Sequence, residues 1–405
     1  MPTNSLKILA VTSEIPWPLN SGGHLRSFYL LREISKSASL RLVVPADPSQ
    51  DENVRALIEQ GINVIPVPGC VRKRHTEAWK ILKSIVRRES YVFYRRHYWK
   101  QVAAEIRKQI ELERPDLVYF DHLDSFTYRK EIGDLPFVVD MHNVYSAISQ
   151  RLANETRNPL KKAYLHHETQ LIQKAEEQVA KSARSVFAVS DIEREHFRSL
   201  GATFASTIPN GVNCEQYKNN KEKPNTNSRE ILFVGDLSWA PNISAALFLA
   251  NEVIPKVRQH SNDATLTIVG RNPVPEIQTL NNLEGVTVIP NAPEILSHYH
   301  RASVLAVPLQ SGGGTRLKIL EAFAASLPVV STPVGCEGLE VVDGEHLIVS
   351  KHDEFADSLS KFVSENCLNR LQTFNALNLV EKTYDWSSVG EKLVSVLHDT
   401  PKNAP

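Results

Sequence analysis

The chain repeats one pattern twice: short runs rich in Val, Ile and Leu alternate with segments of helical periodicity. Apolar runs separated by helices are typical of parallel strands buried between two helical layers. The predicted strands are residues 7–12, 40–44, 63–67, 117–120, 137–140 and 185–189 in the first series and 230–234, 265–269, 286–289, 304–307, 328–331 and 346–349 in the second. The sequence therefore predicts an α/β chain with two doubly wound, Rossmann-like domains.

Helices are predicted at residues 23–36, 53–60, 99–112, 160–182, 242–260, 293–299, 315–325 and 353–364. A polar, Asn- and Lys-rich stretch between the two series cannot bury a core and is typical of a linker. We therefore expect an N-terminal domain over 1–208, a linker over 209–229 and a C-terminal domain over 230–383. Residues 384–405 are expected to form a helix and tail that cross back to the first domain. Two such domains would face each other across a cleft, at the carboxyl ends of their strands.

The bulk composition narrows the class of protein. At 405 residues the chain is too long for one ordinary core, and its net charge of zero argues against a nucleic-acid partner. The four cysteines form no CxxC pair, which indicates a reducing, cytoplasmic environment and no zinc site. The first residues lack the apolar stretch of a secretion signal.

One segment is strongly basic despite the neutral total. Between Arg72 and Lys108 the chain has twelve Lys or Arg and only three Glu, interleaved with aromatic residues. The segment is long enough for two helices broken near Ser90. Two interpretations stay open: a solvated helical face, or an amphipathic surface that rests on anionic lipid or receives an anionic acceptor. The second interpretation implies a peripheral position on the inner face of the plasma membrane.

A glycine-rich loop leads directly into one of the predicted helices. Its residues are Gly312, Gly313, Gly314 and Thr315. Glycines let the backbone come close to a ligand, and a helix N-terminus offers free N–H groups and a positive dipole end. Arg316 and Lys318 add charge in the expected first turn, and Glu321 shares a helix face with Lys318. The pattern is typical of a site for a nucleotide diphosphate, with the ribose on Glu321. The alternative is an ordinary turn followed by a surface ion pair.

Five short motifs, in the expected order, resemble the retaining glycosyltransferases of GT-B architecture, specifically glycosyltransferase family 4. They are residues 16–26 (PWPLNSGGHLR), 209–213 (PNGVN), 233–235 (FVG), 267–270 (TIVG) and 320–332 (LEAFAASLPVVST). The resemblance covers nearly the whole chain. It implies a GT-B fold in which the first domain holds the acceptor and the second holds the nucleotide sugar.

The resemblance also implies roles for particular residues. The donor-binding candidates are Gly22, Gly23, Gly235, Gly270, the loop Gly312–Thr315, and Glu321. The catalytic candidates are His142, which the family places against the donor sugar, together with Arg316 and Lys318. His142 follows the predicted strand 137–140, and sites gather at such strand ends. His122 and Asp121 occupy a similar strand-end position and are secondary candidates. For Gly22 and Gly23 the alternative is a strand-to-helix turn that requires positive φ.

The chain departs from the family pattern in two places. Glycines, Gly313 and Gly314, stand where the first glutamate of the Glu-x7-Glu signature is expected, and residues 236–242 contain no Arg or Lys. A leaving diphosphate still requires positive charge, which Arg316 and Lys318 could supply. The alternative is a degenerate, inactive site.

The implied activity is a metal-independent hexosyltransferase. Its donor is a nucleotide-diphosphate sugar, it needs no further cofactor, and its acceptor is a glycan, a polysaccharide precursor or a lipid-linked saccharide. No Asp-x-Asp occurs in the sequence, so the metal clamp of GT-A enzymes is not expected. Two other classes stay open: a non-catalytic partner subunit that binds sugar nucleotides, and a GT-B-fold epimerase.

Overall fold

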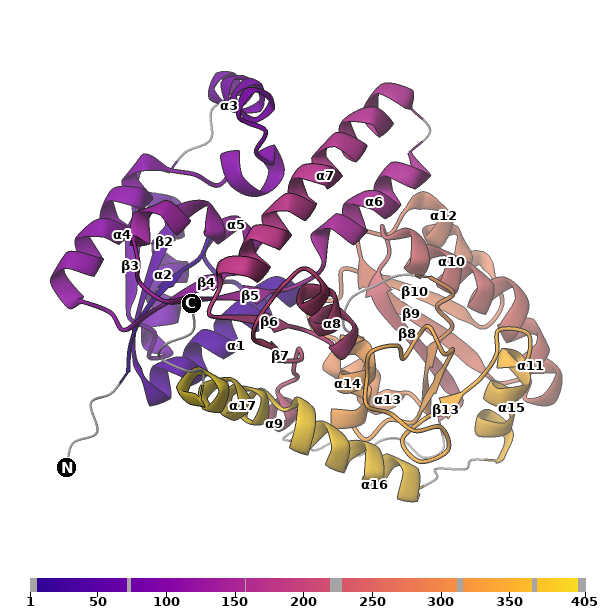
Figure 1. Cartoon of the computed structure of the whole chain (residues 1–405). Helices are drawn as coiled ribbons and strands as arrows, with labels where there is room; N and C mark the ends of the chain where they lie inside the picture. Colours follow the sequence, from indigo (N-terminus) through magenta and orange to yellow (C-terminus); the bar gives the residue numbers. More distant parts are fainter. Residues whose placement is uncertain are drawn as a thin grey trace, which may run out of the picture. The chain divides into compact units, whose positions relative to one another are not determined.

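The computed structural model describes residues 6–70, 74–156, 158–218, 228–311, 316–365 and 370–399. The chain divides into two compact units (Figure 1). Unit 1 comprises Met1–Pro209 and Val389–Pro405, and unit 2 comprises Asn210–Ser388. Each unit contains one sheet of parallel strands flanked by helices, which confirms the predicted α/β class.

Unit 1 is built on seven strands. They are β1 (Lys7–Val11), β2 (Ser39–Pro45), β3 (Val64–Val67), β4 (Leu117–Asp121), β5 (Phe137–Met141), β6 (Ser185–Ala188) and β7 (Ala205–Thr207). The sheet order is β3-β2-β1-β4-β5-β6-β7, and all neighbouring pairs are parallel. The central strands β4 and β5 are buried along their whole length, which explains their continuous apolar sequence.

The helices of unit 1 connect and cover these strands. They are α1 (Gly22–Ser37), η1 (Pro48–Gln50), α2 (Asp51–Glu59), α3 (Arg74–Arg87), η2 (Tyr91–Arg95), α4 (Lys100–Glu113), α5 (His122–Ser125), η3 (Phe126–Ile132), α6 (Tyr145–Glu155), α7 (Pro159–Ser182), α8 (Asp191–Ser199) and most of α17 (Trp386–Asp399). The two helices expected around Ser90 form as α3 and α4. Ser90 caps the single π-turn η2 between them by accepting a hydrogen bond from the Phe93 N–H.

Unit 2 is built on six strands. They are β8 (Glu230–Asp236), β9 (Thr265–Arg271), β10 (Val286–Pro290), β11 (Val304–Val307), β12 (Val329–Ser331) and β13 (Ile348–Val349). Its helices are α9 (Cys214–Lys218), α10 (Ala240–Phe248), η4 (Leu249–Val253), α11 (Ile254–His260), α12 (Pro275–Gln278), η5 (Thr279–Asn282), α13 (Leu296–Arg301), α14 (Leu317–Ala324), α15 (Phe355–Glu365), α16 (Arg370–Leu379) and η6 (Val380–Tyr384). The sheet order is β10-β9-β8-β11-β12-β13, again with parallel pairs.

The two sheets share one topology, so the position at which a ligand is expected to bind is the same in each. In unit 1 the strand order reverses between β1 and β4, and in unit 2 it reverses between β8 and β11. Open parallel sheets bind ligands outside the carboxyl ends of the strands at such a reversal. The topology therefore directs attention to the residues that follow β1, β4, β8 and β11.

The expected linker is only partly described. Residues 214–218 form α9, which belongs to unit 2, and Tyr217 of this helix is buried in the core of that unit. Residues 219–227 lie outside the described part of the chain.

Candidate functional site

The candidate residues of unit 1 lie where β4 and β5 end. Asp121 is the last residue of β4, and His122 follows it, while Asp140 lies in β5 and His142 follows that strand. The two strands are parallel, and Asp121 pairs in register with Asp140. The structure therefore brings the primary candidate His142 and both secondary candidates into one cluster.

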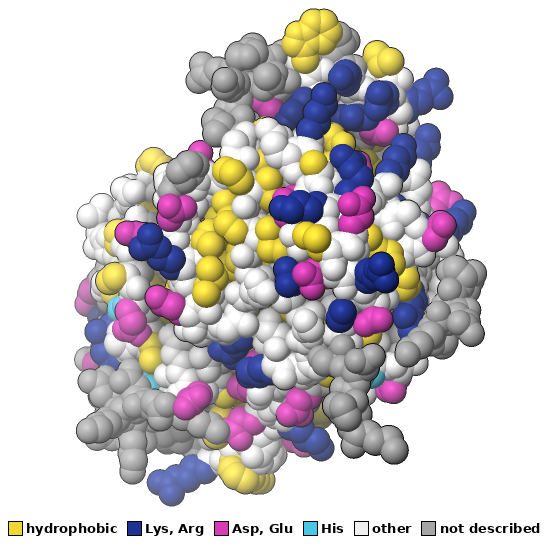
Figure 2. Space-filling model, turned by 90° about the vertical axis from the view of Figure 1, so that its left-hand side faces the viewer, with side chains coloured by type: hydrophobic (Ala, Val, Ile, Leu, Met, Phe, Trp, Pro, Cys, Tyr) yellow, Lys and Arg dark blue, Asp and Glu magenta, His cyan; other side chains and the backbone are white. Residues whose placement is uncertain are grey.

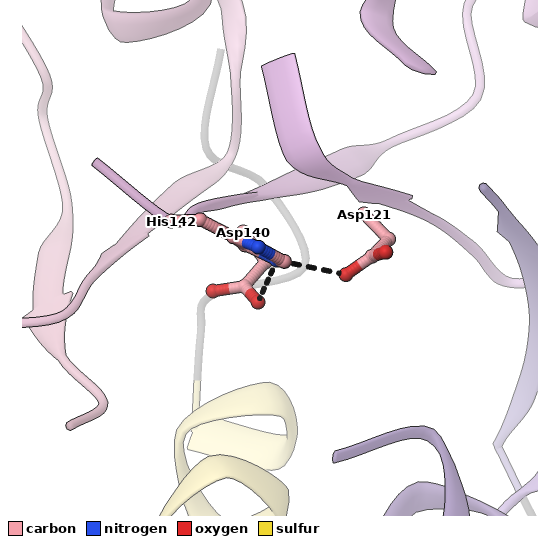
Figure 3. Close-up of side chains that lie close together, drawn as sticks. All are labelled: Asp121, Asp140 and His142. Atoms are coloured by element: carbon pink, nitrogen blue, oxygen red, sulfur yellow. Dashed lines mark hydrogen bonds and ion pairs between the residues drawn. The ribbon is translucent and has the colours of Figure 1, made fainter. Parts of the chain in front are cut away.

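His142 lies between two carboxylates. Its Nε2 atom is 3.1 Å from Asp121 Oδ1 and 3.3 Å from Asp140 Oδ2 (Figure 3). All three side chains are buried. Burial disfavours the charged imidazole, but the two carboxylates outweigh it and raise the pKa of His142 to about 9. His142 is therefore an imidazolium at neutral pH.

Arg26 completes this cluster from helix α1. Its guanidinium donates to both oxygens of Asp140, at 2.8 and 2.5 Å, and to the Ile208 carbonyl at 2.8 Å. Burial raises the pKa of Asp140, but Arg26 and His142 outweigh this effect and hold it below the usual range. Asp121 in turn accepts a hydrogen bond from Ser27, the next residue of α1, at 2.7 Å.

The same residues could in principle hold a metal ion. Among the described residues, Asp121, Asp140 and His142 offer ligand atoms that lie within 4.8 Å of one another. Arg26, however, already occupies both oxygens of Asp140. The trio therefore fits an ion-pair network better than a metal centre.

His122 belongs to a second, adjacent set of polar side chains. Its Nδ1 atom lies 3.1 Å from Asp124 Oδ2, and its Nε2 atom hydrogen-bonds the Tyr145 hydroxyl. The rings of His122 and His142 meet edge to face, with centroids 5.0 Å apart. Burial raises the pKa of Asp124, but His122 and other polar neighbours bring it down to about 2. The two histidines are thus neighbours with separate carboxylate partners.

Gly22 and Gly23 form the first turn of α1. Ser21 caps this helix by accepting a hydrogen bond from the His24 N–H at 3.2 Å. Both glycines are helical and neither has positive φ, so the alternative interpretation as a turn that requires positive φ is wrong. A Cβ on Gly23 would lie 3.9 Å from His142 Nδ1, which places the start of α1 beside the histidine cluster.

In unit 2 the candidate cation Lys318 lies in the first turn of α14. Its ammonium donates to Asn242 Oδ1 at 3.1 Å and lies 4.6 Å from the centroid of the Phe233 ring. Burial and the nearby Arg316 together lower the pKa of Lys318 to about 7. A lysine that is disfavoured as a cation at a helix N-terminus gains by binding an anion.

Glu321 lies one turn further along α14. The Tyr299 hydroxyl donates to Glu321 Oε2 at 2.7 Å, and the Tyr217 hydroxyl also hydrogen-bonds this carboxylate. Burial raises the pKa of Glu321, partly offset by the two hydroxyls and Lys318. The sequence placed Glu321 on the same helix face as Lys318 but gave no sign of the two tyrosines that hold it.

Arg316 differs from its expected position. It is the N-cap residue of α14 rather than a member of the first turn, and its side chain is buried. Its guanidinium donates to the Val334 carbonyl at 2.8 Å and lies 3.9 Å from Glu337. Arg316 therefore binds the chain that follows β12, and Lys318 is the better placed cation for a ligand.

Gly235 and Gly270 have a packing role at the ends of β8 and β9. They pair in register, and a Cβ on Gly270 would lie 1.9 Å from the Gly235 carbonyl oxygen. A Cβ on Gly235 would lie 2.7 Å from the Asn242 side chain, the partner of Lys318. The remaining donor-binding candidates, Gly312, Gly313, Gly314 and Thr315, lie outside the described residues.

Sequence reasoning missed several members of both clusters. Arg26, Ser27 and Tyr145 in unit 1 and Asn242 in unit 2 were not among the candidates. Asp140 gave one usable signal, because a carboxylate within an otherwise apolar strand must be paired when that strand is buried.

Two protein-family models match the chain. The model of "Glycosyltransferase Family 4" matches residues 51–216, and that of "Glycosyl transferases group 1" matches residues 228–365. An uncharacterized 44.6 kDa protein in the cps region of Klebsiella pneumoniae is 23% identical over 397 residues, which cover 95% of this chain and 97% of that protein.

Solved structures share the architecture. HepE of Anabaena, crystallised with UDP and glucose, has a TM-score of 0.67 at 15% identity, and the match covers 97% of this chain and 99% of HepE. TarM of S. aureus has a TM-score of 0.67 at 13% identity, with 100% and 99% covered. The galactosyltransferase WaaB of the lipopolysaccharide outer core has a TM-score of 0.61 at 14% identity, with 98% and 100% covered.

These matches confirm the expected GT-B fold, with its two parallel sheets. In the part of the chain that the structure describes, no helix is both long and apolar enough to cross a membrane. The match to "Glycosyltransferase Family 4" lies mostly in unit 1, and the match to "Glycosyl transferases group 1" lies within unit 2. The chain belongs to the glycosyltransferases of group 1, family 4.

Proposed function

We propose that this glycosyltransferase moves a hexose from a nucleotide-diphosphate sugar to a hydroxyl of an acceptor saccharide, with retention of configuration. HepE is described in complexes with UDP and with UDP-glucose, which supports a nucleotide-sugar donor. The Klebsiella relative comes from the cps region, which supports a polysaccharide precursor or lipid-linked saccharide as acceptor. A cytoplasmic reaction fits the free cysteines Cys70, Cys214 and Cys336.

The observation that carries the proposal is the environment of Lys318. This lysine lies at the start of α14, beside the strand reversal of unit 2. Burial and the neighbouring Arg316 lower its pKa to about 7, and Glu321 offsets only part of this effect. A diphosphate bound there would stabilise the charged ammonium form of Lys318, and the dipole at the N-terminus of α14 would also attract the phosphates. Glu321, one turn away, would accept hydroxyl hydrogen bonds from the ribose.

In the proposed reaction the bond between the anomeric carbon and the departing phosphate oxygen breaks. A bond from that carbon to the acceptor oxygen forms on the same face, and the acceptor proton passes to the departing phosphate oxygen. Lys318 stabilises the negative charge that develops on the phosphate, with Arg316 adding a longer-range field. The His142 imidazolium donates a hydrogen bond to a sugar hydroxyl.

The proposal requires no metal ion. Lys318 and the helix N-terminus take the place of the divalent cation that other glycosyltransferases bind through Asp-x-Asp. Turnover is therefore expected to persist in a chelator such as EDTA. Loss of turnover in EDTA, restored by Mg²⁺ or Mn²⁺, would contradict this part of the proposal.

The test is thermal unfolding against UDP-, GDP-, ADP- and dTDP-sugars, with Glu321→Gln as the control variant. Glutamine keeps one carbonyl oxygen as a hydrogen-bond acceptor but removes the charge that would hold the ribose. A ligand at 100 times its dissociation constant adds about 2.7 kcal/mol, which gives a clear rise in unfolding temperature. A rise with one donor that is reduced in the variant supports the site.

Product analysis separates the remaining classes. Slow hydrolysis of the selected donor without acceptor supports a transferase. An epimerised sugar nucleotide would identify an epimerase, and tight binding with no turnover across acceptors would identify a partner subunit.

A further inference from the structure

The outward face of helix α3 combines large apolar side chains with cations. Trp79 is 67% exposed and Val86 is 76% exposed, and the side chains of Lys83 and Arg87 are exposed as well. Positions 79, 83, 86 and 87 share one face of an α-helix. The face therefore combines apolar area exposed to water with positive charge.

Other side chains of α3 have partners within unit 1. The Tyr91 hydroxyl donates to Glu77 Oε2 at 2.6 Å, and Lys80 lies 3.1 Å from Glu77. The Lys80 ammonium also lies 4.3 Å from the centroid of the Trp99 ring. These contacts hold α3 to unit 1, so the outward apolar side chains are not needed to attach the helix.

The cations of the basic segment fall into two groups. On α4, Arg107 pairs with Glu131 and Lys108 with Glu105. In contrast, no carboxylate of the described residues forms an ion pair with the exposed cations around α3, which are Lys83, Arg87, Arg88 and Arg96. Figure 2 shows Lys and Arg gathered with apolar side chains over the upper part of the face where α3 lies.

We propose that the outward face of α3 docks on an anionic lipid surface. Trp79 and Val86 would enter the boundary between headgroups and acyl chains, while Lys83, Arg87 and Arg88 bind the acidic headgroups. The proposal narrows the basic segment 72–108 to α3 and the residues just after it, because Arg107 and Lys108 of α4 are paired with carboxylates within the fold. No helix of the described residues is long and apolar enough to span a bilayer, so this contact is peripheral. It does not depend on the transfer reaction.

The experiment is co-sedimentation of the full chain with vesicles of phosphatidylcholine alone or mixed with phosphatidylglycerol, without donor or acceptor. Binding is expected only to the mixed vesicles and is expected to weaken at 1 M salt, where the Debye length falls to about 3 Å. Lys83→Glu/Arg87→Glu is expected to lower the partition coefficient roughly 30-fold or more. Trp79→Ala is expected to lower it roughly tenfold.

The control is Lys256→Glu/Lys392→Glu, which makes the same charge change at exposed helical positions of α11 and α17. It is expected to bind like the wild type, and circular dichroism checks that all variants fold. Equal loss in the control would show that only net charge matters and would overturn the docking face. Equal binding to neutral vesicles, or wild-type binding by both α3 variants, would overturn the proposal as well. Self-association without vesicles that Trp79→Ala abolishes would make a second copy the partner instead.

Discussion

At the scale of single residues, the protonated state of His142 links the candidate site to stability. Its pKa of about 9 in the fold exceeds the value of about 6.5 expected in the unfolded chain. The imidazolium therefore stabilises the fold fully below pH 6.5, and this contribution, roughly 3 kcal/mol, is lost as the pH rises through 9. We expect the free energy of unfolding in urea to fall between pH 7 and pH 10 more steeply than in His142→Gln.

Comparing the two proteins at each pH removes the effect of other titrating groups. His260→Gln, at an exposed position of α11, serves as the control and is expected to follow the wild type. Parallel curves for wild type and His142→Gln would contradict the charged state of His142.

Lys318 gives a second prediction, for ligand affinity. Since its pKa is about 7, the free protein loses this cation as the pH rises, and a diphosphate must then bind a neutral amine. Affinity for UDP, or for the diphosphate that the thermal screen selects, is expected to fall about fivefold from pH 7 to pH 8. Lys318→Ala is expected to remove this pH dependence. It is also expected to raise the activation free energy for kcat/KM by about 2–4 kcal/mol and so to lower kcat/KM. Calorimetric titration across pH is the measurement.

Lys256→Ala is the matched control, because it removes an exposed lysine of the same unit. If Lys318→Ala binds UDP with wild-type affinity and the same pH dependence, Lys318 does not hold the phosphates.

Single residues also show where sequence reasoning ends. His142 could be predicted because it follows an apolar strand, and strand ends are a local property of the sequence. Its ion-pair network could not, because Arg26 and Asp140 are separated by 114 positions and meet only through the order of the sheet. The burial of Arg316 was missed for the same reason: its partner Val334 belongs to the segment after β12.

At the scale of elements, alanine substitutions at Gly270 and Gly23 distinguish a glycine required for packing from one expected to act in ligand binding. A Cβ on Gly270 would lie 1.9 Å from a backbone oxygen, so Gly270→Ala is expected to destabilise unit 2 by about 3 kcal/mol or more. Gly23 is helical and a Cβ there meets only His142 Nδ1 at 3.9 Å, so Gly23→Ala should leave stability unchanged or slightly higher. If the start of α1 contacts the substrate, Gly23→Ala should still lower kcat/KM at least roughly tenfold. Urea unfolding and kinetics of the same preparations make the comparison.

The elements themselves were largely predictable. Every predicted strand forms with bounds within two residues of those expected, because buried parallel strands are continuous apolar runs. Strand β7, with the sequence Ala-Ser-Thr, lacks such a run and was missed. The helix predicted over 242–260 is interrupted by the π-turn η4. Pro255 follows this turn and has no N–H for the preceding helical turn, which explains the break.

At the scale of the whole molecule, the two units repeat one sheet topology but carry different charged groups near the strand reversal. Unit 1 places a protonated histidine and paired carboxylates beside its strand reversal, while unit 2 places a lysine and a helix N-terminus there. The first set suits hydroxyl-rich sugars and the second suits phosphate. On this basis we propose that the first domain takes the acceptor and the second takes the nucleotide.

Helix α17 allows the two units to be perturbed separately. Val389, Leu393 and Leu397 form a buried stripe on this helix, which belongs to unit 1 from Val389 onward. Leu393→Ala is expected to cost about 2–5 kcal/mol by leaving a cavity in unit 1, while the nucleotide-induced rise in the unfolding temperature of unit 2 persists. Differential scanning calorimetry with and without nucleotide measures both effects, and Lys392→Ala, at an exposed neighbouring position, is the control. Loss of the nucleotide effect in Leu393→Ala alone would show that donor binding depends on unit 1 and would contradict its assignment to unit 2.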